Sequence, residues 1–204
     1  MTKTIGIVLF PDFEDLDAIG PKEVFGMLAT SSNGEWQVAT VSQGGEPVRS
    51  FLGTTIEADH SFGDCPQLDV LLVPGGLGTR TEVDNEAIIG FVRKQGAGAD
   101  WITSVCTGAF LLHRAGFLEG KRATTHWAAV ELLRQESNVT VVDDERWVRD
   151  GNVITAAGVS AGIDMALYLV AELTNSETAK RVQHMMEYYP KPPQFAEAGE
   201  ETPV

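Results

Sequence analysis

The most informative stretch of the sequence is residues 101–109, which read Trp-Ile-Thr-Ser-Val-Cys-Thr-Gly-Ala. The apolar run at 101–105 predicts a buried strand, and residues 107–115 predict a helix. The chain must therefore reverse at Cys106, and the small residues Gly108 and Ala109 let the helix pack closely against the strand. A strand–turn–helix of this kind exposes the nucleophile in many hydrolases. The stretch predicts a reactive cysteine, although Cys106 by itself also fits a small buried core residue.

The position of Cys106 at a helix N-terminus also predicts its ionisation. Unpaired backbone N–H groups and the helix dipole favour a thiolate there. We therefore expect a lowered pKa for Cys106. The second cysteine, Cys65, lies in a polar loop with no strand before it, and we expect no function for it. Two cysteines require no disulfide in a chain this long, so we expect a reduced, cytoplasmic protein.

Further apolar runs extend the prediction to the whole fold. Strands are predicted at 4–10, 36–41, 70–73 and 101–105, with weak, peripheral strand signals at 48–58 and a hairpin-like pair around 147–157. Helical patterns lie between them, including a helix that begins near Pro21 after an acidic turn at 14–17. Apolar strands that alternate with helices predict an α/β fold with a mostly parallel sheet covered on both faces. We expect one domain over residues 1–193 and a poorly ordered tail over 194–204.

Composition excludes several classes of function. The chain has 204 residues and a net charge of −14, which argues against binding to nucleic acids or anionic membranes, because both need basic patches. No segment approaches the ~20 apolar residues of a membrane span, and the N-terminus has no signal-peptide pattern. No cluster of cysteine and histidine has the spacing of metal ligands, so we predict neither a metal nor a cofactor.

Three other segments supply candidates for a site around the cysteine. Gly75 and Gly76 follow a predicted central strand, where backbone N–H groups could bind an anion, although a tight turn would look the same. Asp17 and its acidic neighbours follow the first strand and could be helix caps, solvated charges or partners of Cys106. His126, beside Trp127, is more typical of a packed histidine than of a catalytic base.

Six short motifs, in their order along the chain, resemble those of the ThiJ/PfpI superfamily. The resemblance runs from about Ile5 to Pro193, and within the superfamily it is greatest to the isocyanide hydratase group. The motifs are Leu16-Asp17-x-x-Gly20-Pro21, Pro74-Gly75-Gly76, Ser104-Val105-Cys106-Thr107-Gly108, Gly120 through Trp127, Arg149-Asp150-Gly151-Asn152 and Ala161-Gly162-Ile163-Asp164. The ligand-sensing domains of some AraC-type regulators share two of these segments.

The resemblance implies a flavodoxin-like sandwich, a homodimer and a nucleophilic cysteine, which is Cys106 here. It implies that Asp17 is the acidic partner of this cysteine. It also implies an anion pocket built from backbone N–H groups of Gly76 and Thr107. Gly158 and Val159, which precede a predicted helix, are expected to line the substrate pocket, and His126 is a further candidate.

One departure from the superfamily narrows the chemistry. Its peptidase members carry histidine directly after the cysteine, whereas this chain has Thr107. That difference argues against peptide cleavage, in which a histidine activates the thiol and protonates an amine. We expect instead the hydration of a small isocyanide to an N-substituted formamide through a Cys106 thioimidate, with Asp17 moving the protons and Thr107 positioning water or donor groups.

Two other functions also fit the sequence. One is a different enzyme of the superfamily, such as a glyoxalase or deglycase acting on a ketoaldehyde. The other is a ligand-sensing or redox-sensing protein related to AraC-type regulators. Those regulators carry an additional helix-turn-helix module, whereas this sequence stops at Val204 after an acidic tail, and its net charge opposes DNA binding.

Overall fold

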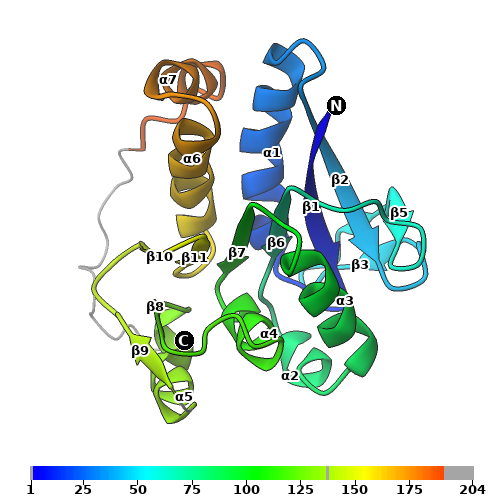
Figure 1. The fold of residues 1–204 in the computed structure, drawn as a ribbon, viewed down its shortest axis with the longest axis vertical. Coiled ribbons are helices and arrows are strands. Elements are labelled where there is room, and N and C mark those ends of the chain that lie inside the picture. The colour runs from blue at the N-terminus through cyan, green and yellow to red at the C-terminus, as the bar shows by residue number, and fades with distance from the viewer. Residues whose placement is uncertain (1, 137, 191–204) are drawn as a thin grey trace.

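The computed structural model describes residues 2–136 and 138–190 (Figure 1). The predicted tail and the predicted domain end at residue 193 lie outside these ranges. The centre of the fold is a seven-stranded sheet. In spatial order its strands are β10 (Trp147–Asp150), β11 (Val153–Ala156), β7 (Trp101–Val105), β6 (Val70–Val73), β1 (Lys3–Leu9), β2 (Trp36–Ser42) and β5 (His60–Ser61). Only the β10–β11 pair is antiparallel. The predicted, mostly parallel sheet is confirmed.

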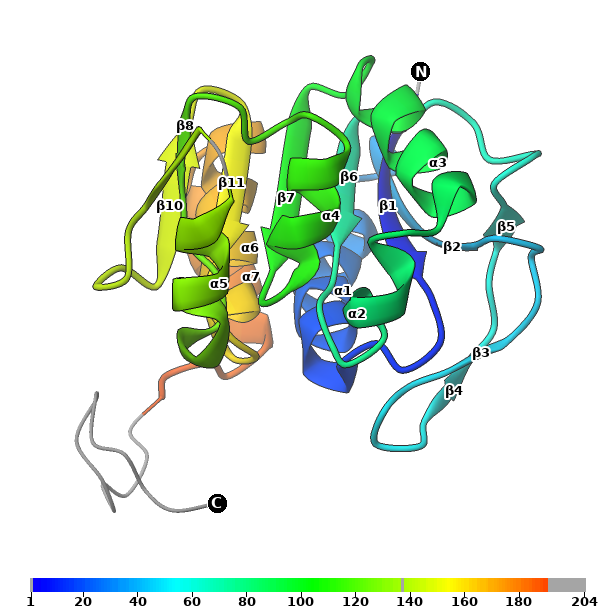
Figure 2. The same ribbon diagram turned by 90° about the horizontal axis from the view of Figure 1, so that it is seen from below.

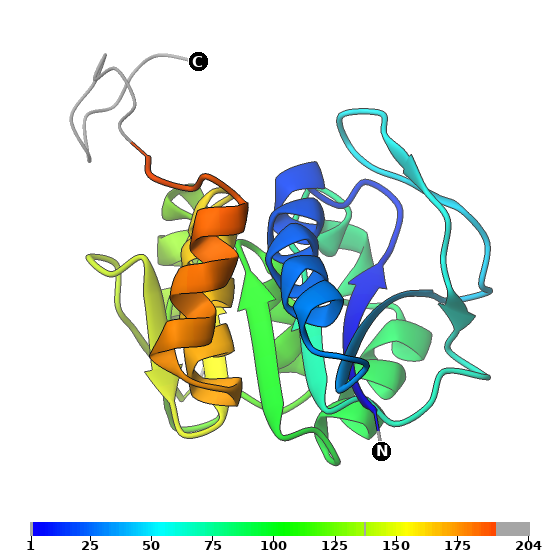
Figure 3. The same ribbon diagram turned by 90° about the horizontal axis from the view of Figure 1, so that it is seen from above.

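Helices cover both faces of this sheet. Figure 3 shows α1 (Asp15–Ser31), α6 (Ala161–Leu173) and α7 (Ser176–Met185) together on one face. Figure 2 shows α2 (Thr79–Glu82), α3 (Glu86–Gly96), α4 (Gly108–Arg114) and α5 (Val130–Gln135) on the other face. Two-sided cover explains why the central strands are continuous apolar runs, because every residue of β6 is buried.

Smaller elements lie at the edges of the sheet. The weak strand signals near residue 50 correspond to a hairpin of β3 (Val48–Arg49) and β4 (Thr55–Ile56). Sequence analysis missed a parallel pair made by β8 (Lys121–Ala123) and β9 (Val139–Val141), because strands of three residues leave no clear alternation. A 3₁₀ turn at Trp127–Ala129 precedes α5.

The predicted start of the first helix is wrong. The structure has no acidic turn followed by a helix at Pro21; α1 begins at Asp15 and contains Pro21. A buried stripe explains the longer helix, since Asp17, Pro21, Val24 and Leu28 recur at helical spacing. Carboxylates are also favourable in a first turn, where they meet the positive end of the helix dipole. Asp17 therefore lies on a helix and not on a turn, so its backbone is held rigidly.

Close packing of α4 against the end of β6 depends on Gly108, whereas the sequence predicts that its small size serves packing against the strand at 101–105. A Cβ atom at Gly108 would lie 2.2 Å from the Val73 carbonyl oxygen and 2.7 Å from that of Pro74. Both atoms belong to backbone and cannot move aside cheaply. A side chain here would push the helix that follows Cys106 away from the sheet.

Gly108→Ala is therefore expected to destabilise the protein by about 2 kcal/mol or more, because overpacking against fixed backbone is costly. Urea denaturation measures the change. The matched control is Gly90→Ala in α3, where an added Cβ meets nothing within 4 Å and helix propensity should stabilise by up to ~1 kcal/mol. Equal stability of the two variants would contradict the packing account.

Candidate functional site

Four neighbouring parallel strands end at the same edge of the sheet, and the candidate residues follow these ends. Asp17 comes after β1, Gly75 after β6, Cys106 directly after β7, and Val159 after β11. Ligand sites of α/β sheets form beyond the carboxyl ends of the strands. The topology thus brings together segments that are far apart in the sequence.

Cys106 lies on a strained turn that the surrounding backbone holds in place. Its φ angle is +56°, an uncommon conformation for a residue other than glycine. The Cys106 N–H donates to the carbonyls of Ala157 at 2.7 Å and Ala156 at 3.0 Å, and the Thr125 hydroxyl donates to the Cys106 carbonyl at 2.8 Å. The side chain is 7% exposed and lines a cavity. The sulfur is therefore fixed and still reachable from that cavity.

Asp17 is the buried carboxyl group beside this sulfur. Its exposure is 0%, and its Oδ2 accepts a hydrogen bond of 2.9 Å from the Gly75 N–H. The Val159 N–H and the Cys106 thiol also act on the carboxyl group and favour its charged form. Among the described residues Oδ1 has no hydrogen-bond partner, although the Cys106 thiol is close enough for each group to shift the pKa of the other.

The two side chains titrate as a pair. Burial raises the pKa of Asp17 to about 7. The Gly75 hydrogen bond lowers this pKa, and the charge of Glu14 raises it further. Burial and the Asp17 charge raise the pKa of Cys106 to about 12, although the Thr107 N–H and hydroxyl favour the thiolate. Between these values the pair holds one proton.

The expectation of a lowered Cys106 pKa is therefore wrong. At a pH between the two pKa values the proton is on sulfur and Asp17 is the carboxylate. The Thr107 N–H and hydroxyl, at the N-cap of α4, favour the thiolate as expected. Burial and a carboxylate next to the sulfur outweigh them.

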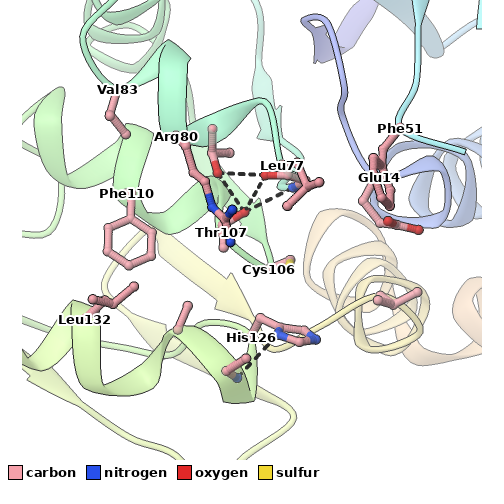
Figure 4. Close-up of a pocket in the computed structure, with 15 residues that line it drawn as sticks. Glu14, Phe51, Leu77, Arg80, Val83, Cys106, Thr107, Phe110, His126 and Leu132 are labelled. Atoms are coloured by element: carbon pink, nitrogen blue, oxygen red, sulfur yellow. Dashed lines mark hydrogen bonds between the residues drawn. The ribbon is translucent and has the colours of Figure 1, made fainter. Parts of the chain in front are cut away.

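The Thr107 hydroxyl is engaged within the protein rather than free for a ligand. It accepts a 3.0 Å hydrogen bond from the Gly76 N–H, and the Thr79 hydroxyl lies 3.0 Å from it (Figure 4). The Gly75 N–H is likewise used by Asp17. In this structure the Gly75 and Gly76 N–H groups, which the sequence offered as anion donors, thus hold Asp17 and Thr107. Neither glycine leaves room for a side chain. A Cβ on Gly75 would lie 2.5 Å from the Thr107 nitrogen, and one on Gly76 would lie 2.4 Å from the Glu14 nitrogen.

His126 and Val159 form another part of the cavity wall, whereas Gly158 is not among the lining residues. Gly158 lies against the imidazole, and an added Cβ would come within 2.2 Å of His126 Cδ2. His126 Nδ1 accepts a 3.3 Å hydrogen bond from the Ala128 N–H, and burial lowers the pKa of the ring. His126 and Val159 both line the cavity. The histidine is thus both packed and exposed to the site.

The cavity itself has a volume of ≈ 400 Å³ and is mostly apolar. Figure 4 shows Cys106 and Thr107 between Arg80 and Phe110 on one side and Glu14 and Phe51 on the other. Sequence reasoning missed most of the side chains that enclose the site, namely Phe51, Leu77, Thr79, Arg80, Val83, Phe110, Ala128, Ala129 and Leu132. They come from separate loops and helices, and no local pattern links them. Glu14, which also lines the cavity, belongs to the acidic segment that the sequence singled out around Asp17.

Residues 2–136 and 138–190 contain neither a candidate metal centre nor a helix that could cross a membrane. In those ranges no three His, Cys, Asp or Glu side chains are grouped as metal ligands. No helix there has the length and apolarity needed to cross a membrane.

Comparison with known proteins identifies the family. Residues 3–172 match the sequence profile of the DJ-1/PfpI family. The chain belongs to this family. Isonitrile hydratase of Pseudomonas putida is 45% identical over 95% of this chain and 82% of that protein. A ThiJ/PfpI family protein from Pseudomonas syringae superimposes with a TM-score of 0.89 at 37% identity, covering 98% of this chain and 80% of the other.

A transcriptional regulator is a more distant relative of this DJ-1/PfpI protein. GbdR of Pseudomonas aeruginosa is 26% identical over 91% of the chain, which spans 51% of the regulator. The predicted resemblance to the ThiJ/PfpI superfamily is confirmed, including its overlap with regulator domains.

The raised Asp17 pKa predicts a dependence of stability on pH. The unfolded carboxyl titrates near 3.8 and the folded one near 7, so between these values the folded protein holds a proton that the unfolded chain has lost. The free energy of unfolding should therefore fall as pH rises through this window. Asp17→Asn has no such proton and can still accept the Gly75 hydrogen bond.

Relative to wild type, Asp17→Asn should gain on the order of 2–4 kcal/mol of stability between about pH 4 and pH 8. Urea denaturation at several pH values measures this gain. A stability difference that does not change with pH would contradict the raised pKa.

Proposed function

We propose that this DJ-1/PfpI protein is an isonitrile hydratase, which adds water to an isocyanide, R–N≡C, to give the formamide R–NH–CHO. The observation that carries the proposal is the 45% identity to isonitrile hydratase over nearly the whole chain. The site supports it, because a buried thiol and carboxyl share one proton at an apolar cavity. GbdR and its relatives are more distant, and the sensor reading has no comparable support.

In this proposal Cys106 is the nucleophile. The isocyanide carbon lies against the sulfur, and an S–C bond forms as Asp17 takes the thiol proton. Asp17 then gives this proton to the same carbon, which yields the thioimidate R–N=CH–S–Cys106. A carboxyl group with a pKa of about 7 suits both transfers at neutral pH, because it gains and loses a proton at similar cost.

Asp17 moves a second proton during hydrolysis. A water molecule attacks the thioimidate carbon while Asp17 accepts its proton and passes it to the nitrogen. The C–S bond then breaks, the hydroxyl proton returns to the Cys106–Asp17 pair, and the formamide leaves. One carboxyl group that acts first as base, then as acid, needs no histidine after the cysteine. Thr107 is a positioning residue, since its hydroxyl fixes the Gly76 turn beside Cys106.

Cys106→Ala should have no measurable turnover of an aryl isocyanide, because no thioimidate can form. Asp17→Asn should lose about 10³-fold or more in kcat, the combined effect of losing acid–base transfer and thiol activation. Formamide appearance is followed by chromatography. Cys65→Ser is the control that keeps activity, since Cys65 lies outside the cavity. Turnover by Cys106→Ala would refute the mechanism.

The same assay with methylglyoxal tests the rival enzyme activity. Faster turnover of methylglyoxal than of every isocyanide offered would favour a glyoxalase-like function. A homodimer and a cytoplasmic location stay predictions, and so does the absence of a metal from the reaction. Sedimentation of the purified protein tests the first.

A further inference from the structure

Arg80 is a charged side chain that the proposed mechanism does not use. Of the described residues that line the cavity, it alone carries a permanent positive charge. Figure 4 shows its side chain running from α2 toward Thr107, with Phe110 nearby. A guanidinium at a mostly apolar cavity is a candidate for recognising an anionic part of a ligand.

No carboxylate among the described residues neutralises the Arg80 charge. Arg114, Arg134 and Arg149 each pair with a carboxylate. Across residues 2–136 and 138–190, no carboxylate lies within ion-pair distance of Arg80, although the chain has 29 acidic and 15 basic residues. An arginine without a carboxylate in so acidic a protein keeps its donors available for an external anion.

The reaction restricts where an anionic group can lie. The isocyano group is linear and ends in the reacting carbon, so the side group must extend away from the Cys106 sulfur. A carboxylate next to Asp17 would be repelled, and Glu14 adds a second acidic group to that side. The apolar side chains of Phe110 and Leu132 suit the body of the substrate. Among the described lining residues, Arg80 then offers the position with a permanent positive charge for a negatively charged group.

We propose that Arg80 selects isocyanides whose apolar side group ends in a carboxylate. This inference rests on the proposed function and names its substrate class. Arg80 is exposed, so water and salt will screen the pair, and a modest, salt-sensitive preference is expected rather than an absolute requirement.

The test compares para-isocyanobenzoate with its neutral, nearly isosteric amide. At low ionic strength, wild type should favour the carboxylate by roughly tenfold in kcat/KM. Arg80→Gln should abolish this ratio, Arg80→Lys should retain part of it, and added salt should reduce it in wild type. The matched control is Arg122→Gln, which removes the same charge from an exposed residue outside the cavity and should keep the ratio.

No preference in wild type, or a preference that survives Arg80→Gln, would overturn the inference. A loss of preference in Arg122→Gln would do so too, because it would assign the effect to net charge. If wild type hydrates neither compound nor other isocyanides, the proposed function fails instead.

A binding measurement tests whether Arg80 recognises a carboxylate, whether or not the protein hydrates isocyanides. Calorimetry with para-formamidobenzoate should give binding to the Cys106→Ala protein that weakens roughly tenfold when Arg80→Gln is added. Equal affinity of the two proteins, or no binding to either, would overturn the inference.

Discussion

The site depends on one proton shared by Asp17 and Cys106. Two negative charges on buried, adjacent groups would be costly, so the pair keeps a proton over the whole neutral range. Burial raises both pKa values, and the Gly75, Val159 and Thr107 N–H groups oppose it. The result is a thiol with a base already beside it. This differs from an exposed thiolate at a helix end, which would react with any electrophile and oxidise readily.

The parallel sheet makes this pair possible. The ends of β1, β6, β7 and β11 are neighbours, so Asp17, Gly75, Cys106 and Val159 meet without a long loop. Glycine is required where these segments touch, because a Cβ on Gly75 would collide with Thr107 and one on Gly158 with His126. The same contacts use up the Gly75 and Gly76 N–H groups. These backbone donors therefore hold Asp17 and Thr107 in place, and the cavity is mostly apolar.

The sequence predicted the central strands and the Cys106 turn well, because long apolar runs and small residues carry strong local signals. It chose Asp17 over the neighbouring acidic residues as the partner of Cys106 only through the family resemblance, and it put that residue on a turn instead of a helix. The stripe through Pro21, Val24 and Leu28 contained the missing information, but a proline suggested a helix start. The direction of the Cys106 pKa shift was beyond local reasoning, since it depends on burial and on a charge from another strand end. The cavity walls, Arg80 among them, come from separate segments and needed the structure.

The alkylation rate of Cys106 as a function of pH tests the shared proton most directly. In a Cys65→Ser background, the rate of carboxamidomethylation can be read by intact mass. The account predicts a rate that keeps rising beyond about pH 10, and a profile displaced to lower pH by Asp17→Asn, which removes the neighbouring charge. A rate that reaches its plateau below pH 7 would mean a stable thiolate and would contradict the account.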